Sequence, residues 1–172
     1  MKTIKELENK NFFLIAGPCV IESKKTTNEI ANSLSNICNR LEIPFIFKAS
    51  YKKANRTKLS SFTGIGDLDA LKILEDIKNK YNIPVTSDVH STEEIKLASK
   101  FLDIIQIPAF LCRQTDLLIA AAKTNKIVNI KKGQFMDPIN MGYAIKKVTE
   151  HNNKNIIITE RGSMFGYQDL IV

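Results

Sequence analysis

Six short apolar runs alternate with helix-like segments along the chain, and this alternation limits the fold more than any other feature of the sequence. The runs are residues 12–16, 44–48, 84–88, 104–108, 127–131 and 156–160. They are rich in β-branched and aromatic residues, which is typical of strands covered on both faces of a sheet. The order strand, helix, strand, helix therefore predicts a parallel α/β fold.

Helical periods occupy the intervals between these runs. We expect helices over residues 28–41, 67–80, from 91 onward, 114–124 and 139–150. The first helix should be capped at Thr26, whose spacing to Glu29 is that of a capping box. Its expected buried stripe is Ile30, Leu34, Ile37 and Leu41.

The next two helices carry similar signals. The second has an apolar stripe of Leu68, Leu71, Leu74 and Ile77. Ser91 and Glu94 form a capping pair for the third, with Ile95 and Ala98 facing inward. The glycines of "TGIGD", residues 63–67, follow no strong strand and lack the third glycine of a dinucleotide loop, so we interpret them as a plain turn into the second helix.

Polar residues at the strand ends favour a barrel over a doubly wound sheet, between which the spacing of the runs distinguishes only weakly. Lys48, Asp88, Gln106, Lys131 and Arg161 all lie at or just beyond the carboxyl end of a run. A (β/α)₈ barrel, the TIM barrel, builds its site at that end of its strands. We therefore predict a (β/α)₈ barrel.

The predicted barrel is incomplete. Such a barrel has eight strands in about 250 residues, whereas this chain supplies six runs in 172 residues. We expect residues 1–11 to form an N-terminal cap or hairpin and residues 12–172 to form the barrel domain, incomplete at its C-terminus. Another helix should begin within "FGYQDLIV".

Positive charge gathers at the predicted strand ends. Lys48, Lys53, Arg56, Lys131, Lys132 and Arg161 face only Asp88 and Glu160. Any one of these cations is explained by a surface salt bridge, but several on successive strands indicate a site for a phosphorylated substrate, because Arg and Lys bind phosphate. His90 shares the strand-end location, either as a hydrogen-bonded bystander or as a member of this site.

Composition excludes several other classes of protein. The net charge is +7 with a pI near 9.3, but the cations are dispersed and no aromatic stacking platform accompanies them, which disfavours a nucleic-acid binder. The apolar runs are too short for a membrane span or a signal peptide, so we expect a cytoplasmic location and no membrane partner.

The cysteines do not form a disulfide framework or a zinc ribbon. Cys19, Cys38 and Cys112 are odd in number and widely spaced. We expect Cys38 and Cys112 to pack in the core. Cys19 follows the first strand and is an inert thiol, a metal ligand or a reactive thiolate.

Six motifs in register resemble one enzyme family. They are "AGPCVIES", "FKASYKKANR", "TSDVH", "QIPAFLCRQTDLL", "VNIKKGQF" and "TERGSMFGY". Together they resemble the 3-deoxy-D-manno-octulosonate 8-phosphate (KDO-8-phosphate) synthases of lipopolysaccharide formation. The resemblance implies a (β/α)₈ barrel, usually tetrameric, that condenses phosphoenolpyruvate with arabinose 5-phosphate and releases inorganic phosphate.

The resemblance also implies roles for individual residues. The catalytic residues would be Lys48, Asp88, His90 and Lys131. Phosphoenolpyruvate would be bound by Lys48, Ser50, Lys53, Gln106, Lys131 and Arg161. Arabinose 5-phosphate would be bound by Lys53, Asn55, Arg56, Asp88 and, from a neighbouring subunit, Arg113.

Cys19 matches the position at which metal-dependent members of the family carry a ligand. The resemblance therefore implies a divalent ion such as Zn²⁺, Fe²⁺ or Mn²⁺ in the full-length enzyme. The family's other ligands, a histidine, a glutamate and an aspartate, come from later strands that this sequence does not include. A thiolate alone does not hold a metal well, so we do not expect this chain by itself to bind the ion.

Two further hypotheses stay open beside the synthase. One is the related aldol synthase that uses erythrose 4-phosphate, although "KANR" after "FKAS" favours the arabinose enzyme. The other is an inactive, truncated copy that retains only the affinity for sugar phosphates and other anions.

Overall fold

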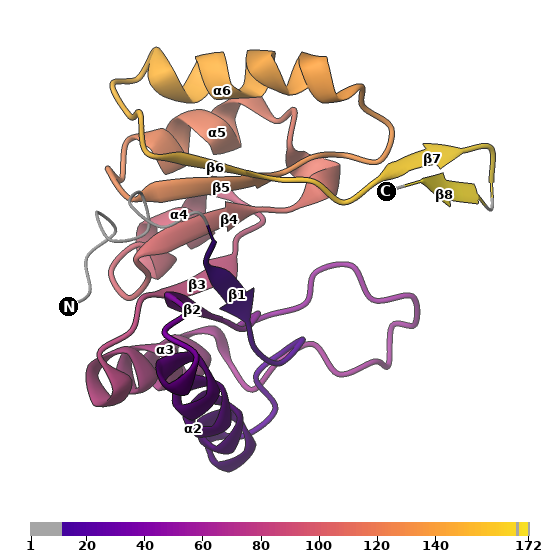
Figure 1. Cartoon of the computed structure of the whole chain (residues 1–172). Helices are drawn as coiled ribbons and strands as arrows, with labels where there is room; N and C mark the ends of the chain where they lie inside the picture. Colours follow the sequence, from indigo (N-terminus) through magenta and orange to yellow (C-terminus); the bar gives the residue numbers. More distant parts are fainter. Residues whose placement is uncertain (1–11, 168, 172) are drawn as a thin grey trace. The chain divides into compact units, whose positions relative to one another are not determined.

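A computed structural model describes residues 12–167 and 169–171 (Figure 1). The expected cap at residues 1–11 lies outside the described residues. The chain divides into two compact units. The first runs to Asp88 and includes Phe101–Asp103, and the second comprises Val89–Lys100 and the chain from Ile104 onward.

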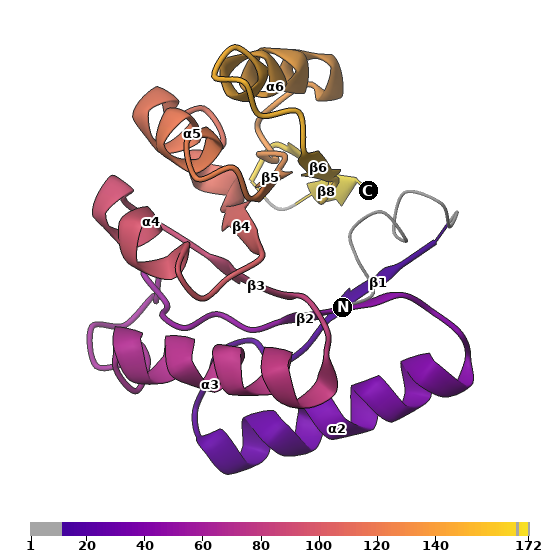
Figure 2. The ribbon, with the colours of Figure 1, turned by 90° about the vertical axis from the view of Figure 1, so that its left-hand side faces the viewer.

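The first unit contains three parallel strands and two helices. In chain order these are β1 (Leu14–Ala16), α2 (Lys24–Arg40), β2 (Phe45–Lys48), α3 (Asp67–Tyr81) and β3 (Val85–Asp88). The strand order is β1-β2-β3, with Ala16 opposite Phe47 and Lys48 opposite Thr86. Helices α2 and α3 pack against each other along these strands (Figures 1 and 2).

The second unit repeats this arrangement. It contains α4 (Thr92–Ala98), β4 (Ile104–Ile107), the 3₁₀ turn η1 (Ala109–Leu111), α5 (Thr115–Ala122), β5 (Ile127–Lys131), the 3₁₀ turn η2 (Pro138–Asn140), α6 (Met141–Thr149), β6 (Ile156–Thr159), β7 (Ser163–Phe165) and β8 (Asp169–Ile171). Strands β4, β5 and β6 are parallel, with Gln106 opposite Asn129 and Lys131 opposite Thr159. Helix α5 packs between α4 and α6 (Figure 2).

All six predicted strands are present, and the five helices predicted between them lie in their expected intervals. The strands β1 to β6 alternate with the helices α2 to α6. This is the element order and strand direction of a partial (β/α) barrel, so the predicted fold class is confirmed.

Strand β5 shows how an apolar face is separated from a polar one toward the carboxyl end of a strand. In β5, Val128 and Ile130 point to one face and are buried, whereas Asn129 and Lys131 point to the other. In β3, Thr86 and Asp88 share a face in the same way. The apolar faces pack under the helices, and the polar faces are left for a site.

Two predictions about α2 are wrong. Its N-cap is Ser23, whose side chain accepts a hydrogen bond from the Thr26 backbone N–H, so the helix begins four residues earlier than the expected residue 28. Its buried side chains are Thr27, Ala31, Ser35 and Cys38. These small residues allow close packing, and they turn the larger Ile37 and Leu41 outward, to 43% and 56% exposure.

The predictions for α3 and α4 are mostly confirmed. Leu71, Leu74 and Ile77 are buried, while Leu68 at the start of the stripe is exposed. Gly66, in the "TGIGD" turn, is the N-cap residue of α3. Ser91 caps α4 by accepting a hydrogen bond from the backbone N–H of Glu94.

The helix expected within "FGYQDLIV" does not form. Strands β7 and β8 pair antiparallel, with Met164 opposite Leu170, and make a hairpin beyond the end of β6 (Figure 1). Gly166 has a φ of +63°, a conformation that glycine adopts without strain and that suits the turn of a hairpin.

No helix in the described part of the chain is both long enough and apolar enough to cross a membrane.

Candidate functional site

In the first unit, the predicted site residues Lys48, Ser50, Lys53 and Asp88 form one hydrogen-bonded cluster. Lys48 is the last residue of β2 and Asp88 the last residue of β3. The Nζ atoms of Lys48 and Lys53 each donate to Ser50 Oγ at 2.9 Å, and Ser50 Oγ donates to Asp88 Oδ1. The structure therefore brings Asp88, at the end of β3, together with three residues at and just after the end of β2.

The charges of this cluster do not cancel. Lys48 Nζ lies 3.6 Å from Asp88 Oδ1, and both side chains are largely buried, at 19% and 12% exposure. Burying charged groups is costly unless they are paired and hydrogen-bonded, and the cluster contributes two ammonium groups against one carboxylate. It can therefore accept an anionic group from a ligand.

Gly17 fixes the backbone beside Lys48. Its φ is +156°, and a Cβ atom at this position would lie 2.0 Å from the carbonyl oxygen of Lys48. Only glycine allows the chain after β1 to pass so close to the end of β2. Cys19, two residues further, is exposed rather than buried against the cluster.

Asn55 and Arg56 lie on the long loop that follows β2, which extends away from the strands of its unit (Figure 1). Both side chains are exposed. Arg56 Nε donates to the carbonyl oxygen of Phe62 at 3.0 Å, and the Lys53 backbone N–H donates to Thr63 O at 2.8 Å. These two bonds fold the loop back on itself.

In the second unit, a row of polar side chains crosses β4, β5 and β6. Asn129 Nδ2 donates to Gln106 Oε1 at 3.5 Å, and Thr159 Oγ1 donates to Asn129 Oδ1 at 2.7 Å. Gln106 and Asn129 are buried. Lys131 lies one pleat beyond Asn129 on the same face of β5, so its side chain leaves the strand next to this row.

Lys132 does not belong to the expected group of accessible cations, because its side chain is 1% exposed. Its Nζ donates to the carbonyl oxygens of Gly162 at 2.8 Å, Met136 at 3.2 Å and Gly133 at 3.3 Å, and to Ser163 Oγ at 3.2 Å. Lys132 directly follows β5, which ends at Lys131. With these contacts, Lys132 is closed off by protein oxygen atoms.

Arg161 follows β6 in a turn held by Glu160. Glu160 Oε1 accepts from the backbone N–H groups of Arg161 at 2.8 Å and Gly162 at 2.7 Å, and lies 3.3 Å from Lys132 Nζ. Desolvation raises the pKa of Glu160, but the hydrogen bonds from Gly162, Arg161 and Lys132 lower it by more, so the pKa falls below its ordinary value.

His90 is held by Glu94 at the start of α4. Glu94 Oε2 accepts from the His90 backbone N–H at 2.8 Å and lies 3.0 Å from His90 Nδ1. Both side chains are largely buried, at 16% and 14% exposure. Glu94 therefore fixes the position of the His90 ring through its Nδ1 edge.

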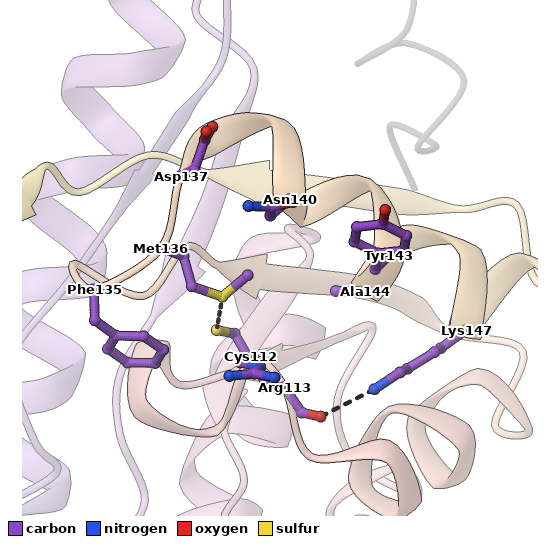
Figure 3. A pocket seen from close by; sticks show the side chains of 9 residues that line it. All are labelled: Cys112, Arg113, Phe135, Met136, Asp137, Asn140, Tyr143, Ala144 and Lys147. Atoms are coloured by element: carbon purple, nitrogen blue, oxygen red, sulfur yellow. Dashed lines mark hydrogen bonds between the residues drawn. The ribbon is translucent and has the colours of Figure 1, made fainter.

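Arg113 lines a pocket of about 430 Å³ in the second unit (Figure 3). Lys147 Nζ donates to the backbone oxygen of Arg113 at 3.1 Å and to Thr115 Oγ1 at 2.7 Å. Cys112, which is buried as predicted, contacts the sulfur of Met136 at 3.3 Å. Arg113 itself is exposed.

The divalent metal implied by the family does not fit the residues described. Within residues 12–167 and 169–171, no three His, Cys, Asp or Glu side chains are grouped so that they could hold an ion. Zinc sites in proteins use three or four protein ligands, and Cys19 supplies one.

Sequence reasoning missed two polar residues that support the predicted ones, Asn129 and Thr159. It named Glu94 and Glu160 but not their contacts with His90 and with the turn after β6, and it did not predict the enclosed position of Lys132. The signal for Asn129 was available, because it breaks the apolar run "IVNIK" two residues before Lys131 and must share its face. The contacts of Glu94 and Glu160 had no comparable sequence signal.

Comparison with known proteins gives one family and a uniform set of relatives. The model of the DAHP synthetase I family matches residues 2–170. A 2-dehydro-3-deoxyphosphooctonate aldolase of Koribacter versatilis (strain Ellin345) is 54% identical over 167 residues, which are 97% of this chain and 60% of that protein. Proteins of the same name from Trichlorobacter lovleyi and Fusobacterium nucleatum subsp. nucleatum are 55% and 54% identical, over 92% and 95% of this chain and 58% and 59% of their own lengths. The chain thus spans about three fifths of these relatives.

Proposed function

Because this chain belongs to the DAHP synthetase I family, we propose that it carries substrate-binding residues of a KDO-8-phosphate synthase, which condenses phosphoenolpyruvate with arabinose 5-phosphate and water. The products are 3-deoxy-D-manno-octulosonate 8-phosphate and inorganic phosphate. The observation that carries the proposal is the Ser50 cluster, in which two lysines gather around one hydroxyl against a single carboxylate. The names of the relatives support the choice of this reaction.

The proposed reaction joins two anions, and positive side chains lower the cost of bringing them together. Carbon 3 of phosphoenolpyruvate attacks the aldehyde carbon of the sugar, whose oxygen becomes an alkoxide and takes up a proton. Positive charge develops at carbon 2, water adds there, and inorganic phosphate leaves. Cations held in fixed positions offset the repulsion between the substrates and keep the reacting carbons close.

The proposal assigns roles to residues of both units. Lys131 and Arg161 bind the phosphate group of phosphoenolpyruvate. The further contacts of this substrate are Lys48, Ser50, Lys53 and Gln106. Lys53, Asn55, Arg56 and Asp88 bind arabinose 5-phosphate. A second copy of the chain supplies Arg113. The proposal therefore includes a homo-oligomer, which the family resemblance implies to be a tetramer.

The catalytic roles fall to Lys48, Asp88, His90 and Lys131. Lys48 and Lys131 stabilise negative charge, and Asp88 and His90 orient the sugar and move its proton. A divalent metal stays a prediction that follows from the family resemblance alone. A cytoplasmic location also remains a prediction.

The test is phosphate release from phosphoenolpyruvate by the purified 172-residue protein, with arabinose 5-phosphate or erythrose 4-phosphate as the second substrate. Each assay is run with and without added Zn²⁺, Mn²⁺ or Fe²⁺, and the Lys131→Ala variant serves as the matched control. Release that requires arabinose 5-phosphate and falls in the variant supports the proposal. Release with erythrose 4-phosphate alone overturns the choice of sugar.

Calorimetric titration with phosphoenolpyruvate decides the case in which no phosphate is released. Binding without release supports the assignment of the binding residues and the hypothesis of an inactive, truncated copy. Absence of both binding and release in a protein of confirmed mass overturns the assignment of these residues.

A further inference from the structure

Lys132 connects the two segments that carry the predicted phosphate ligands of the second unit. Its backbone N–H donates to Thr159 O at 2.9 Å, which joins the end of β5 to the end of β6. Its Nζ donates to Gly162 O at 2.8 Å and to Ser163 Oγ at 3.2 Å on the segment after β6. The same Nζ donates to Met136 O and Gly133 O on the segment after β5.

The neighbours of Lys132 in this arrangement are the proposed anion ligands. Lys131 immediately precedes it in the chain. Arg161 lies between Glu160 and Gly162, and both of these residues contact Lys132 Nζ, at 3.3 Å and 2.8 Å. The backbone on each side of Arg161 is therefore held by contacts that converge on one ammonium group.

A direct contact between Lys132 and a ligand is incompatible with this geometry. The side chain is 1% exposed, and Nζ has three N–H donors for the five oxygen atoms around it. A buried ammonium group that loses such partners is destabilised strongly. A substrate phosphate would have to break this enclosure to reach it.

We propose that Lys132 is a positioning residue: its enclosed ammonium group joins the segments after β5 and β6 and thereby fixes the spacing of Lys131 and Arg161. The inference rests on the proposed function, because that function makes Lys131 and Arg161 the phosphate ligands. Two cations that bind one phosphate repel each other in its absence. A contact that holds the backbones of Lys131 and Arg161 in place without the ligand preorganises the pair.

The oxygen cage provides a specific test, because removal of the side chain leaves a space that a small cation can occupy. In Lys132→Ala, the carbonyl oxygens of Met136 and Gly162 lose the hydrogen bond from Nζ, and that of Gly133 keeps only the one from the Met136 backbone N–H. We expect phosphoenolpyruvate, used as the calorimetric probe, to bind about tenfold or more weakly to this variant. Ammonium chloride should restore much of the affinity, whereas sodium chloride at the same ionic strength should not.

Amide hydrogen exchange provides the second measurement and does not depend on the ligand. Residues 133–136 and 160–164 should exchange faster in Lys132→Ala than in the wild type, and ammonium should slow them again. Lys146→Ala, which removes a lysine with a 70% exposed side chain on α6, is the matched control and should change neither readout. Lys132→Met, which keeps the volume of the side chain, replaces the alanine variant if that protein does not fold.

The outcomes separate this inference from the proposed function. Wild-type affinity together with wild-type exchange in the Lys132 variant overturns the positioning role. In Lys132→Ala, lost affinity with no response to ammonium also overturns it, whereas Lys132→Met leaves no space for ammonium and is judged by affinity and exchange alone. If the wild type binds no phosphoenolpyruvate, the proposed function fails, while the exchange measurement still decides whether Lys132 joins the two segments.

Discussion

Lys131 and Arg161 are the residues at which the proposed phosphate contact can be tested most directly. We expect Lys131→Ala and Arg161→Ala each to weaken phosphoenolpyruvate binding by about ten- to a hundredfold, because each removes a charge-assisted hydrogen bond. Isothermal titration of the two variants, beside Lys146→Ala as a surface control, measures the change. Unchanged affinity in either variant would show that this phosphate clamp is misplaced.

Gly17 allows a prediction about stability that is independent of any ligand. The Cβ atom of Gly17→Ala would lie 2.0 Å from Lys48 O, in backbone that must move to accept it. We expect a loss of about 2 kcal/mol or more in the free energy of unfolding, read from urea denaturation. Gly142→Ala on α6 is the matched control, because nothing lies within 4 Å of its added Cβ. The control should be neutral or stabilising by up to about 1 kcal/mol, and equal effects of the two substitutions would contradict the close approach.

Glu160 predicts how the stability of the protein responds to acid. Its pKa in the folded protein lies below its ordinary value of 4.5, so the carboxylate form is favoured by folding. Its contribution to stability is present above the pKa of the unfolded chain and is lost as the pH falls through the folded pKa. We expect the wild type to be more stable than Glu160→Gln at neutral pH, and the difference to shrink below about pH 4.5.

Urea denaturation of both proteins between pH 7 and pH 3 measures this difference. Parallel stability curves over that range would mean that the bonds from Arg161, Gly162 and Lys132 do not favour the ionised form of Glu160.

At the scale of single elements, α2 offers a test of which residue caps it. Ser23 accepts the Thr26 backbone N–H at 3.1 Å, whereas the sequence had favoured Thr26 as the cap. We expect Ser23→Ala to lower the free energy of unfolding by about 1 kcal/mol. Thr26→Ala is the matched control and should have a smaller effect, as measured by urea denaturation. A larger effect of the control would restore the sequence-based assignment.

The sequence predicted the elements well where local pattern decides them. The runs around Ile46, Val128 and Ile157 are short, apolar and β-branched, and each forms a strand. The pattern did not predict which face of α2 is buried. The apolar pattern predicted that larger residues of α2 would be buried, but Ala31, Ser35 and Cys38 are buried instead. Their small side chains allow the close packing against neighbouring elements.

The hairpin of β7 and β8 could not be predicted for a different reason. Its strands are three residues each, and a sequence pattern needs a longer run to distinguish strand from helix. The expectation of a helix came from the regular order of the barrel rather than from the residues themselves. Gly166 was the available local signal for a turn.

The residues that end neighbouring strands were the part of the candidate site that the sequence could predict. Lys48 and Asp88 come together because neighbouring parallel strands end at the same edge. The side chain of Lys132 could not be placed in this way. Whether a lysine after a strand meets solvent or a ring of carbonyl oxygens depends on how two separate loops fold, which the local sequence does not encode.

At the scale of the whole molecule, exposed apolar side chains bear on self-association. Phe110, Phe135, Ile139 and Tyr143 of the second unit are between 58% and 85% exposed, and Phe135 and Tyr143 line the pocket that contains Arg113. Exposed apolar groups of this kind mark interaction surfaces. They support the proposal that a second copy of the chain contributes Arg113.

We therefore expect the protein to sediment as an oligomer and Ile139→Lys to shift it toward a smaller species, because a buried charge opposes association. Analytical ultracentrifugation over a range of concentrations measures this. Lys146→Gln on α6 also changes the net charge by one unit, in the opposite direction, without removing apolar surface, and should leave the distribution unchanged. An identical distribution for Ile139→Lys would exclude this surface from the interface.

The hydroxyl group of Ser50 is fully occupied before any ligand arrives. It accepts from Lys48 and Lys53 and donates to Asp88, which uses both of its lone pairs and its one proton. A ligand oxygen that reaches Ser50 must therefore replace one of these partners. Ligand binding at Ser50 therefore exchanges one hydrogen-bond partner for another and leaves the number of hydrogen bonds constant. Its selectivity depends on how much more strongly the displaced lysine binds the ligand than it bound Ser50.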